Sequence, residues 1–218
     1  MDCPRNMLDL THTLAEKHFL NSQTLKDFFT ELSSFIFLLQ KSLGEAFVEI
    51  SSAVYAHKSA LISKTAELRP PCIIGADTQI RQSAFIRGCV IVGEGCVVGN
   101  SSEVKNAVLF DGVQIPHFNY VGDSILGYKA HMGAGAIISN VKGDKTNVEI
   151  RGKDIVYPTN LKKFGAMLGN FVEVGCNTVI NPGTVVCENT QIYPLSSVRG
   201  VIPPNSIYKS KSQIIAKK

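Results

Sequence analysis

Apolar residues return at every sixth position over most of the chain, starting near residue 54. This series consists of Ile62, Leu68, Ile74, Ile80, Ile86, Val92, Val98, Val104 and Phe110, then Leu126, Met132 and Ile138, then Leu168, Val174, Ile180, Val186, Ile192 and Val198. A period of six is neither helical nor that of a simple strand, and short repeats mark a solenoid. Three hexapeptides make one triangular coil, stacked about 4.8 Å from the next by parallel strand pairing. The pattern predicts a mainly β protein, a parallel β-helix over residues 55–140 and 165–207.

The N-terminal part of the chain has a helical pattern instead. Apolar residues at 25, 28, 29, 32, 35, 36, 39 and 43 lie on one face of an α-helix. Asn21 or Ser22 suits its start, and Gly44 stands where a helix ends. A weaker pattern of Leu10, Leu14 and His18 precedes it. We therefore expect residues 1–53 to be a short α-helical segment.

Two stretches break the six-residue period. Phe110 and Leu126 are sixteen residues apart, which is no multiple of six, so we expect a bulge around His117. Residues 141–166 keep no register, are basic, and predict a short hairpin turning at Arg151–Lys153. Excursions from a regular scaffold often carry function, although a tolerated insertion explains this one as well. The predicted domains are thus the helical segment 1–53, the β-helix 54–207 with its insertion at 141–166, and a basic C-terminal tail, 208–218.

Composition narrows the classes of partner. The chain is 44% hydrophobic and 18% charged with a net charge of +4, which suits small anionic substrates better than nucleic acid. Its six cysteines form no C-x-x-C pair, so we expect reduced thiols in the cytoplasm. The N-terminus shows no signal peptide, and the most apolar window, residues 28–39, is shorter than the ~20 residues of a membrane span. Neither a nucleic acid nor a membrane is an expected partner.

Three cations recur with the spacing of one coil. Arg69, Arg87 and Lys105 are eighteen residues apart and should stack on neighbouring coils. Two cations ~5 Å apart repel by about 3 kcal/mol at an effective dielectric of 20, and a bound phosphate would remove that repulsion. We expect Arg69 to extend into water and Arg87 with Lys105 to grip a phosphate. His117 follows inside the expected bulge, and with His131 it lacks the spacing of a three-histidine metal site, so no metal is expected.

Several segments resemble one enzyme family. RGCVIVGEGCVVGNSSEVKNAV, PHFNYVGDSILG and HMGAGAIISN resemble the acetyltransferase domain of the bifunctional N-acetylglucosamine-1-phosphate uridyltransferase / glucosamine-1-phosphate acetyltransferase family. LKKFGAMLGNFVEVGCNTVINPG is similar to archaeal-type sugar-1-phosphate nucleotidyltransferases with a like C-terminal domain. Together the resemblance covers about residues 55–210. It implies that the coils wind into a left-handed parallel β-helix.

The resemblance also implies an activity and a set of site residues. Members of the family move acetyl from acetyl-CoA to the amine of an amino-sugar 1-phosphate, in UDP-N-acetylglucosamine and cell-envelope precursor synthesis, as homotrimers without a metal. By position, His117 matches the general base. The matches to substrate contacts are Arg87, Lys105, Tyr120 and Asn140, with His131 standing where the family has an asparagine. The matches to the acetyl-CoA site are Ala134, Asn140, Cys176 and Lys211.

Two other functions remain open at this point. The His131 departure fits another hexapeptide acyltransferase, with a longer acyl donor or a different amine. A non-catalytic β-helix could instead serve a separate sugar nucleotidyltransferase as its partner, although such a scaffold does not need His117, Arg87 and Lys105. No Gly-rich nucleotidyltransferase loop appears in the sequence, so uridyltransferase activity is not expected of this chain.

Overall fold

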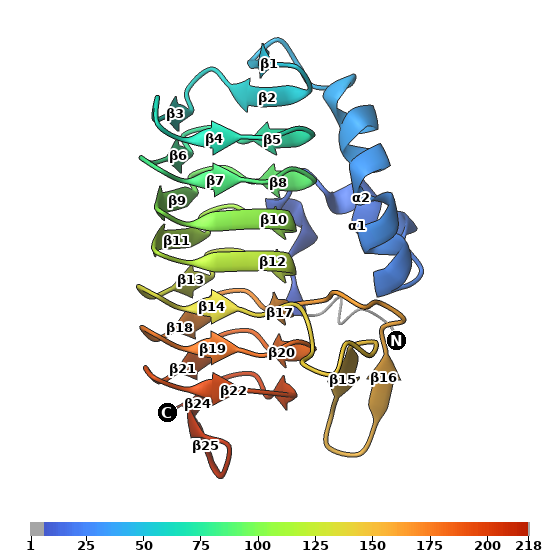
Figure 1. Ribbon diagram of the computed structural model, residues 1–218, viewed down its shortest axis with the longest axis vertical. Coiled ribbons are helices and arrows are strands. Elements are labelled where there is room, and N and C mark those ends of the chain that lie inside the picture. The colour runs from blue at the N-terminus through green and yellow to red at the C-terminus, as the bar shows by residue number, and fades with distance from the viewer. Residues whose placement is uncertain (1–6, 218) are drawn as a thin grey trace.

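The computed structural model describes residues 7–217 as a left-handed parallel β-helix with helices along one side (Figure 1). Three columns of parallel strands form its three faces. The first face holds β4 (Glu67–Leu68), β7 (Phe85–Ile86), the starts of β10 (Glu103–Leu109) and β12 (Tyr120–Leu126), β14 (Ile137–Ile138), β19 (Val179–Ile180) and β22 (Ser197–Val198). The second holds β2 (Val54–His57), β5 (Cys72–Ile74), β8 (Val90–Val92), the ends of β10 and β12, β17 (Ala166–Leu168), β20 (Thr184–Val186) and β23 (Val201–Ile202). The third holds β3 (Leu61–Ile62), β6 (Gln79–Ile80), β9 (Val97–Asn100), β11 (Gln114–His117), β13 (His131–Met132), β18 (Glu173–Val174), β21 (Gln191–Ile192) and β24 (Ser206–Ser210).

The six-residue series, with the exception of Phe110, fills the inside of the coils, as predicted. Ile86 pairs with Leu68 and Val104, eighteen residues away on either side, and all three belong to the series. From Ile74 onward its members are at most 2% exposed, whereas Ile62 and Leu68 in the first coil are half-buried. Cys72 and Cys96 are buried and free, as expected of interior thiols.

Two neighbouring coils, which we call the short coils, have seventeen residues in place of eighteen, and here two predictions were wrong. Val104 pairs with Val121 and Leu109 with Leu126, both seventeen residues apart. The missing residue lies at the corner between the first and second faces, after Val104 and again after Val121. No bulge forms around His117, because β11 stays in register between β9 and β13. Leu109, rather than Phe110, takes the interior position, and Phe110 packs outward against Phe19 at a ring distance of 5.4 Å.

The helical segment consists of a 3₁₀ turn, η2 (Leu10–His12), and the helices α1 (Glu16–Asn21) and α2 (Leu25–Gln40), which lie beside the second face (Figure 1). Thr24, rather than the predicted Asn21 or Ser22, caps α2, because its side chain and that of Asp27 form a capping box. The predicted end at Gly44 was also late, since the helix stops at Gln40. Gln40 donates to the carbonyl of Ala53 at 2.9 Å, which ties the end of α2 to the first coil. Neither helix is long and apolar enough to cross a membrane.

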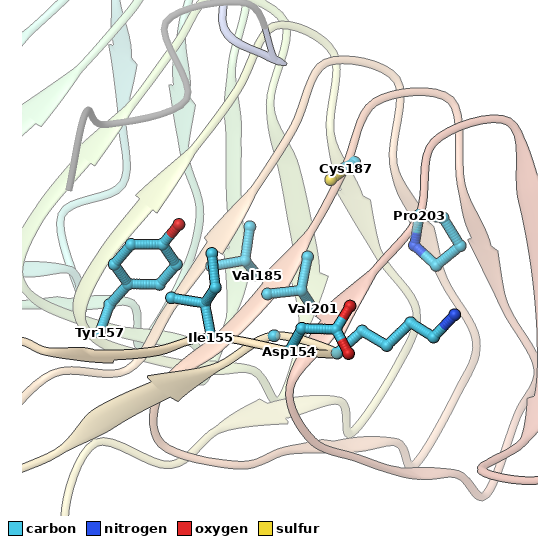
Figure 2. Close-up of a pocket in the computed structure, with 9 residues that line it drawn as sticks. Asp154, Ile155, Tyr157, Val185, Cys187, Val201 and Pro203 are labelled. Carbon is cyan, nitrogen blue, oxygen red and sulfur yellow. The ribbon is translucent and has the colours of Figure 1, made fainter.

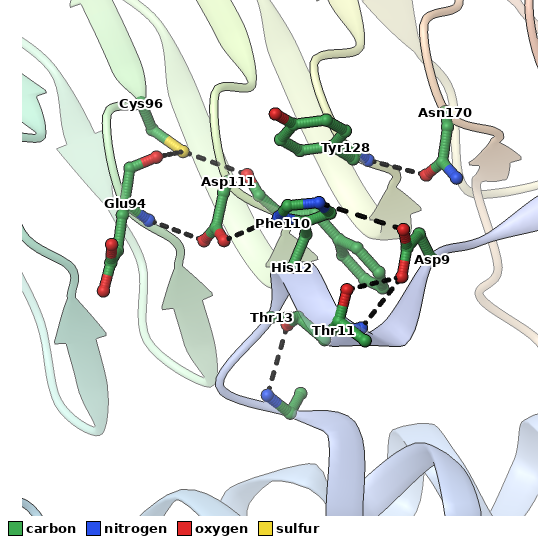
Figure 3. A network of polar contacts seen from close by, with 11 residues as sticks. Asp9, Thr11, His12, Thr13, Glu94, Cys96, Phe110, Asp111, Tyr128 and Asn170 are labelled. Carbon is green, nitrogen blue, oxygen red and sulfur yellow. Dashed lines mark hydrogen bonds and ion pairs between the residues drawn. The ribbon is translucent and has the colours of Figure 1, made fainter.

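A polar network fastens the start of the described chain to the β-helix (Figure 3). The ring of His12 stacks on Tyr128 with centroids 3.7 Å apart. Its two nitrogens lie 3.5 Å from Asp111 and 3.8 Å from Asp9. Asn170 accepts from the Tyr128 backbone at 2.9 Å and so holds the neighbouring coil in the same network.

Antiparallel hairpins close both ends of the β-helix and form the insertion. β1 (Phe47–Ser51) pairs with β2 at one end, and β25 (Gln213–Ala216) pairs with β24 at the other. The insertion leaves the coil after Asn140 and forms the predicted hairpin, from β15 (Glu149–Arg151) and β16 (Val156–Pro158). Its turn spans residues 152–155 and is closed by a 2.8 Å hydrogen bond from Gly152 to Ile155. The hairpin lies against the last coils of the second face (Figure 1).

Candidate functional site

Arg87 and Lys105 directly follow the paired first-face residues Ile86 and Val104, so they lie on adjacent coils. The Arg87 backbone donates to the Val104 carbonyl at 2.8 Å, which keeps the two in register. Arg69 comes one coil earlier, and its guanidinium lies over Phe85 at 4.8 Å and pairs with Glu67 at 2.7 Å. The stacked column therefore exists as the sequence predicts.

The two cations do not depend on a phosphate for relief from repulsion, because each already has a carboxylate. The Arg87 guanidinium donates to Glu103 at 2.6 Å, and this hydrogen bond raises the pKa of Arg87. The Lys105 ammonium lies 3.6 Å from Asp123. The four groups sum to zero charge, which corrects the simpler picture of a purely positive column.

Asp123 and Glu103 are the residues that sequence reasoning missed. The Asp123 side chain is only 5% exposed, and its Oδ1 accepts from Asn106 at 2.7 Å. Its Oδ2 accepts from the Asn140 amide. The sequence did hold one signal for them. The apolar residues Val104 and Leu109, and again Val121 and Leu126, are five residues apart instead of six, which marks the two shortened corners where Asn106 and Asp123 lie.

Tyr120 lies on the first face, on the same coil as Asp123. It pairs with Glu103, and burial raises the pKa of its phenol, with a further rise from the carboxylates of Glu103 and Asp123. A Cβ on Gly122 would come within 2.6 Å of the Tyr120 hydroxyl and 2.7 Å of the Asn140 amide. Glycine at this position therefore lets the two side chains approach each other. Arg87, Lys105, Tyr120 and Asn140 form one cluster, which we call the acceptor cluster.

His117 lies at the other end of the first face, where the chain arrives from the third face. It ends β11 and is exposed, while its carbonyl accepts from Gly135 at 3.0 Å. One coil on, the Ala134 carbonyl accepts from Asn177 at 2.9 Å, and Gly133 backs onto Cys176. His117, Ala134 and Cys176 thus stack along one corner, which we call the histidine corner. Asn140, predicted to contact both ligands, belongs to the acceptor cluster.

His131 joins neither group. It projects from the third face, with Nδ1 2.8 Å from Glu173, and lines a hollow of about 510 Å³ with Gln114, Lys129, Phe171 and Glu173. Its place on a strand of another face separates it from the acceptor cluster within this chain.

Lys211 lies in the turn between β24 and β25, near the end of the β-helix. It lines a hollow of about 390 Å³ with three further cations, Lys142, Arg151 and Arg199. The hairpin turn borders this hollow and also an apolar one of about 620 Å³ (Figure 2). The apolar hollow includes Cys187, and burial raises the pKa of its thiol to about 11, which makes it a poor nucleophile.

Among residues 7–217 no three His, Cys, Asp or Glu side chains gather as they would around a metal ion.

Comparison with solved structures supports the fold. A hexapeptide transferase family protein from Anaplasma phagocytophilum superposes with a TM-score of 0.50 at 15% identity, covering 76% of this chain and 80% of that one.

Sequence comparison identifies bifunctional proteins as relatives of this chain. A bifunctional sugar-1-phosphate nucleotidylyltransferase/acetyltransferase of Sulfurisphaera tokodaii is 37% identical over 44% of this chain and 24% of its own length. The bifunctional protein GlmU of Methanococcus maripaludis is 34% identical over 56% of this chain and 29% of its own length. The chain thus spans about a quarter of these relatives. The sequence profile of the family described as "GMPPB C-terminal domain" matches residues 68–192, more than half of the chain, and the chain belongs to this family.

Proposed function

We propose that the chain is an acetyl-CoA-dependent N-acetyltransferase whose acceptor is the amine of an amino-sugar 1-phosphate such as glucosamine 1-phosphate. The observation that carries this proposal is the first face itself. It has two cations on adjacent coils at one end, an exposed histidine at the other, and Tyr120 between them. The name of the Sulfurisphaera tokodaii relative, which includes an acetyltransferase, supports the same class of reaction.

The acceptor phosphate would bind Arg87 and Lys105 by exchange with Glu103. The Glu103 side chain is 31% exposed and that of Arg87 is 41% exposed, so their ion pair opens to water at little cost. Asp123 is buried and stays with Lys105. A phosphate dianion then replaces one surface carboxylate and gains charge-assisted hydrogen bonds from both cations.

His117 would act as the general base. The amine nitrogen attacks the thioester carbonyl, and its proton passes to the imidazole. Collapse of the intermediate then breaks the C–S bond, and the imidazolium returns that proton to the leaving sulfur, which gives the CoA thiol and the free base. The oxyanion needs a donor. The N–H groups of Gly133 and Gly135 donate to the carbonyls of Val174 and His117. The Ala134 N–H, by contrast, has no acceptor within residues 7–217. Ala134 is therefore the donor that we propose at the histidine corner.

Lys211 would serve the coenzyme phosphates together with Lys142, Arg151 and Arg199. A hollow lined by four cations and one carboxylate, Glu149, suits a polyanion, since Arg and Lys are the usual ligands of phosphate.

We also propose a homotrimer. Phe118 and Leu195, 62% and 79% exposed, flank the histidine corner, and Ile137 is 40% exposed beside them. A second subunit would bury this strip.

Release of the CoA thiol, measured across a panel of amino-sugar 1-phosphates, tests the activity. We expect release with a glucosamine-1-phosphate-like acceptor and none with the sugar lacking its phosphate. Release only with other amines or longer acyl donors would favour another hexapeptide acyltransferase, a reading that His131 supports. Absence of release with every acceptor would favour a non-catalytic partner of a separate nucleotidyltransferase.

A further inference from the structure

The corner that follows the first face is built differently in the two short coils. Gly88 and Gly183, with φ of 86° and 80°, turn this corner in ordinary coils. In the short coils Asn106 and Asp123 turn it, with φ of 47° and 48°. Asparagine and aspartate tolerate this left-handed region better than other residues with a side chain. Since glycine turns the same corner elsewhere, the fold does not require a carboxylate there.

The Asp123 carboxylate nevertheless connects three successive coils. It accepts amide hydrogens from Asn106 on the coil before and from Asn140 on the coil after, and it pairs with Lys105 at 3.6 Å. A carboxylate with a side chain 5% exposed is costly to bury unless such partners surround it. These partners include two residues of the acceptor cluster.

The contact with Asn140 also settles which end of that amide is free. A carboxylate only accepts hydrogen bonds, so the Asn140 nitrogen must face Asp123. The oxygen is then the end left for a ligand, as an acceptor for an amine or a hydroxyl. On the same corner Lys105 supplies a positive donor. Asp123 therefore determines both the place of a cation and the polarity of an amide.

We propose that Asp123 is a positioning residue, which orients Lys105 and Asn140 toward one zwitterionic ligand, with the ammonium for the phosphate and the amide oxygen for the amine or hydroxyl. This inference rests on the proposed acceptor class. It gives the two carboxylates different roles. Glu103 is only partly buried and exchanges with the ligand, whereas Asp123 stays in place and does not touch the ligand.

The test is the change Asp123→Asn in the full chain. Asparagine keeps the shape but removes the charge beside Lys105, and it lets the Asn140 amide turn. We expect KM for glucosamine 1-phosphate to rise ~10- to 100-fold, as for the loss of charge-assisted hydrogen bonds. We expect kcat to stay within about 3-fold, because His117 lies at the other corner. A purely structural role would lower the melting temperature without this split.

Asp77→Asn is the matched control. Asp77 also has a left-handed backbone, with φ of 55°, but it is exposed and lies at a different corner, between β5 on the second face and β6 on the third. Its KM should equal that of the wild type. A folded Asp123→Asn protein with an unchanged KM would overturn the proposal. If that variant does not fold, Asn106→Gly removes one partner of the carboxylate without touching the acceptor cluster, and an unchanged KM there is equally decisive.

The wild type separates this inference from the proposed function. If it transfers no acetyl group, the proposed activity fails, and Asp123 is then judged by calorimetric binding of glucosamine 1-phosphate. Binding to the wild type that weakens in Asp123→Asn supports the positioning role. Equal binding to both proteins, or none to either, overturns it.

Discussion

The two ion pairs of the acceptor cluster differ in burial, and that difference predicts unequal effects on stability. Lys105 and Asp123 have side chains 26% and 5% exposed, whereas Arg87 and Glu103 are 41% and 31% exposed. The perturbation is Lys105→Met, with Arg87→Met as its counterpart one coil away. Methionine keeps much of the apolar stem of either side chain, so the comparison isolates the charged ends.

The magnitude for Lys105 follows from the geometry. Two unit charges 3.6 Å apart attract by about 5 kcal/mol at an effective dielectric of 20. Desolvation of the ammonium offsets part of this, and Asp123 keeps its two amide partners after the change. We expect a net loss of about 2 kcal/mol in the free energy of unfolding. For a chain of this size that lowers Tm by about 4–8 °C. Arg87→Met should leave Tm nearly unchanged, because exposed ion pairs contribute little.

Differential scanning calorimetry of the two variants and the wild type, at one protein concentration, measures the effect. The concentration must be the same because an oligomer is stabilised by mass action. Equal losses at Lys105 and Arg87, or a larger loss at Arg87, would show that burial of the Asp123 pair does not control its contribution. The assignment of Asp123 as the permanent partner of Lys105 would then be wrong.

Three further changes test the histidine corner, the coil interior and the close approach over Gly122. His117→Ala should lower kcat by ~10²-fold or more with an unchanged circular dichroism spectrum, as for the loss of a general base, and an unchanged kcat would remove His117 from that role. Ile180→Asp should yield no folded protein, because Ile180 is fully buried and an unpaired charge inside the coil has no partner, so a cooperative melt would contradict the interior position. Gly122→Ala should raise KM for the sugar phosphate, since its Cβ would lie 2.6 Å from the Tyr120 hydroxyl, and wild-type kinetics would argue against a packed cluster there.

The sequence by itself determined the repeating part of this fold. Each coil needs one aliphatic residue per face inside a narrow prism. The period of six therefore follows directly from the local geometry of the coil. The same spacing put Arg87 beside Lys105, because residues one coil apart are neighbours in space. Helix α2 was also predictable from the sequence, since its buried face repeats with the helical period.

Only the tertiary structure decided where the period slips and what surrounds the cations. The sixteen residues from Phe110 to Leu126 predicted a bulge, but a deletion can be absorbed at any corner, and the chain absorbs it twice beside the acceptor cluster. That choice depends on side chains from three coils, Asn106, Asp123 and Asn140, which no short window of sequence contains. For the same reason the carboxylates of Glu103 and Asp123 were missed, because ion pairs across coils form between residues sixteen to eighteen positions apart. Local spacing records the backbone geometry of a coil, whereas the charge balance of the site is set by the stacking of its corners.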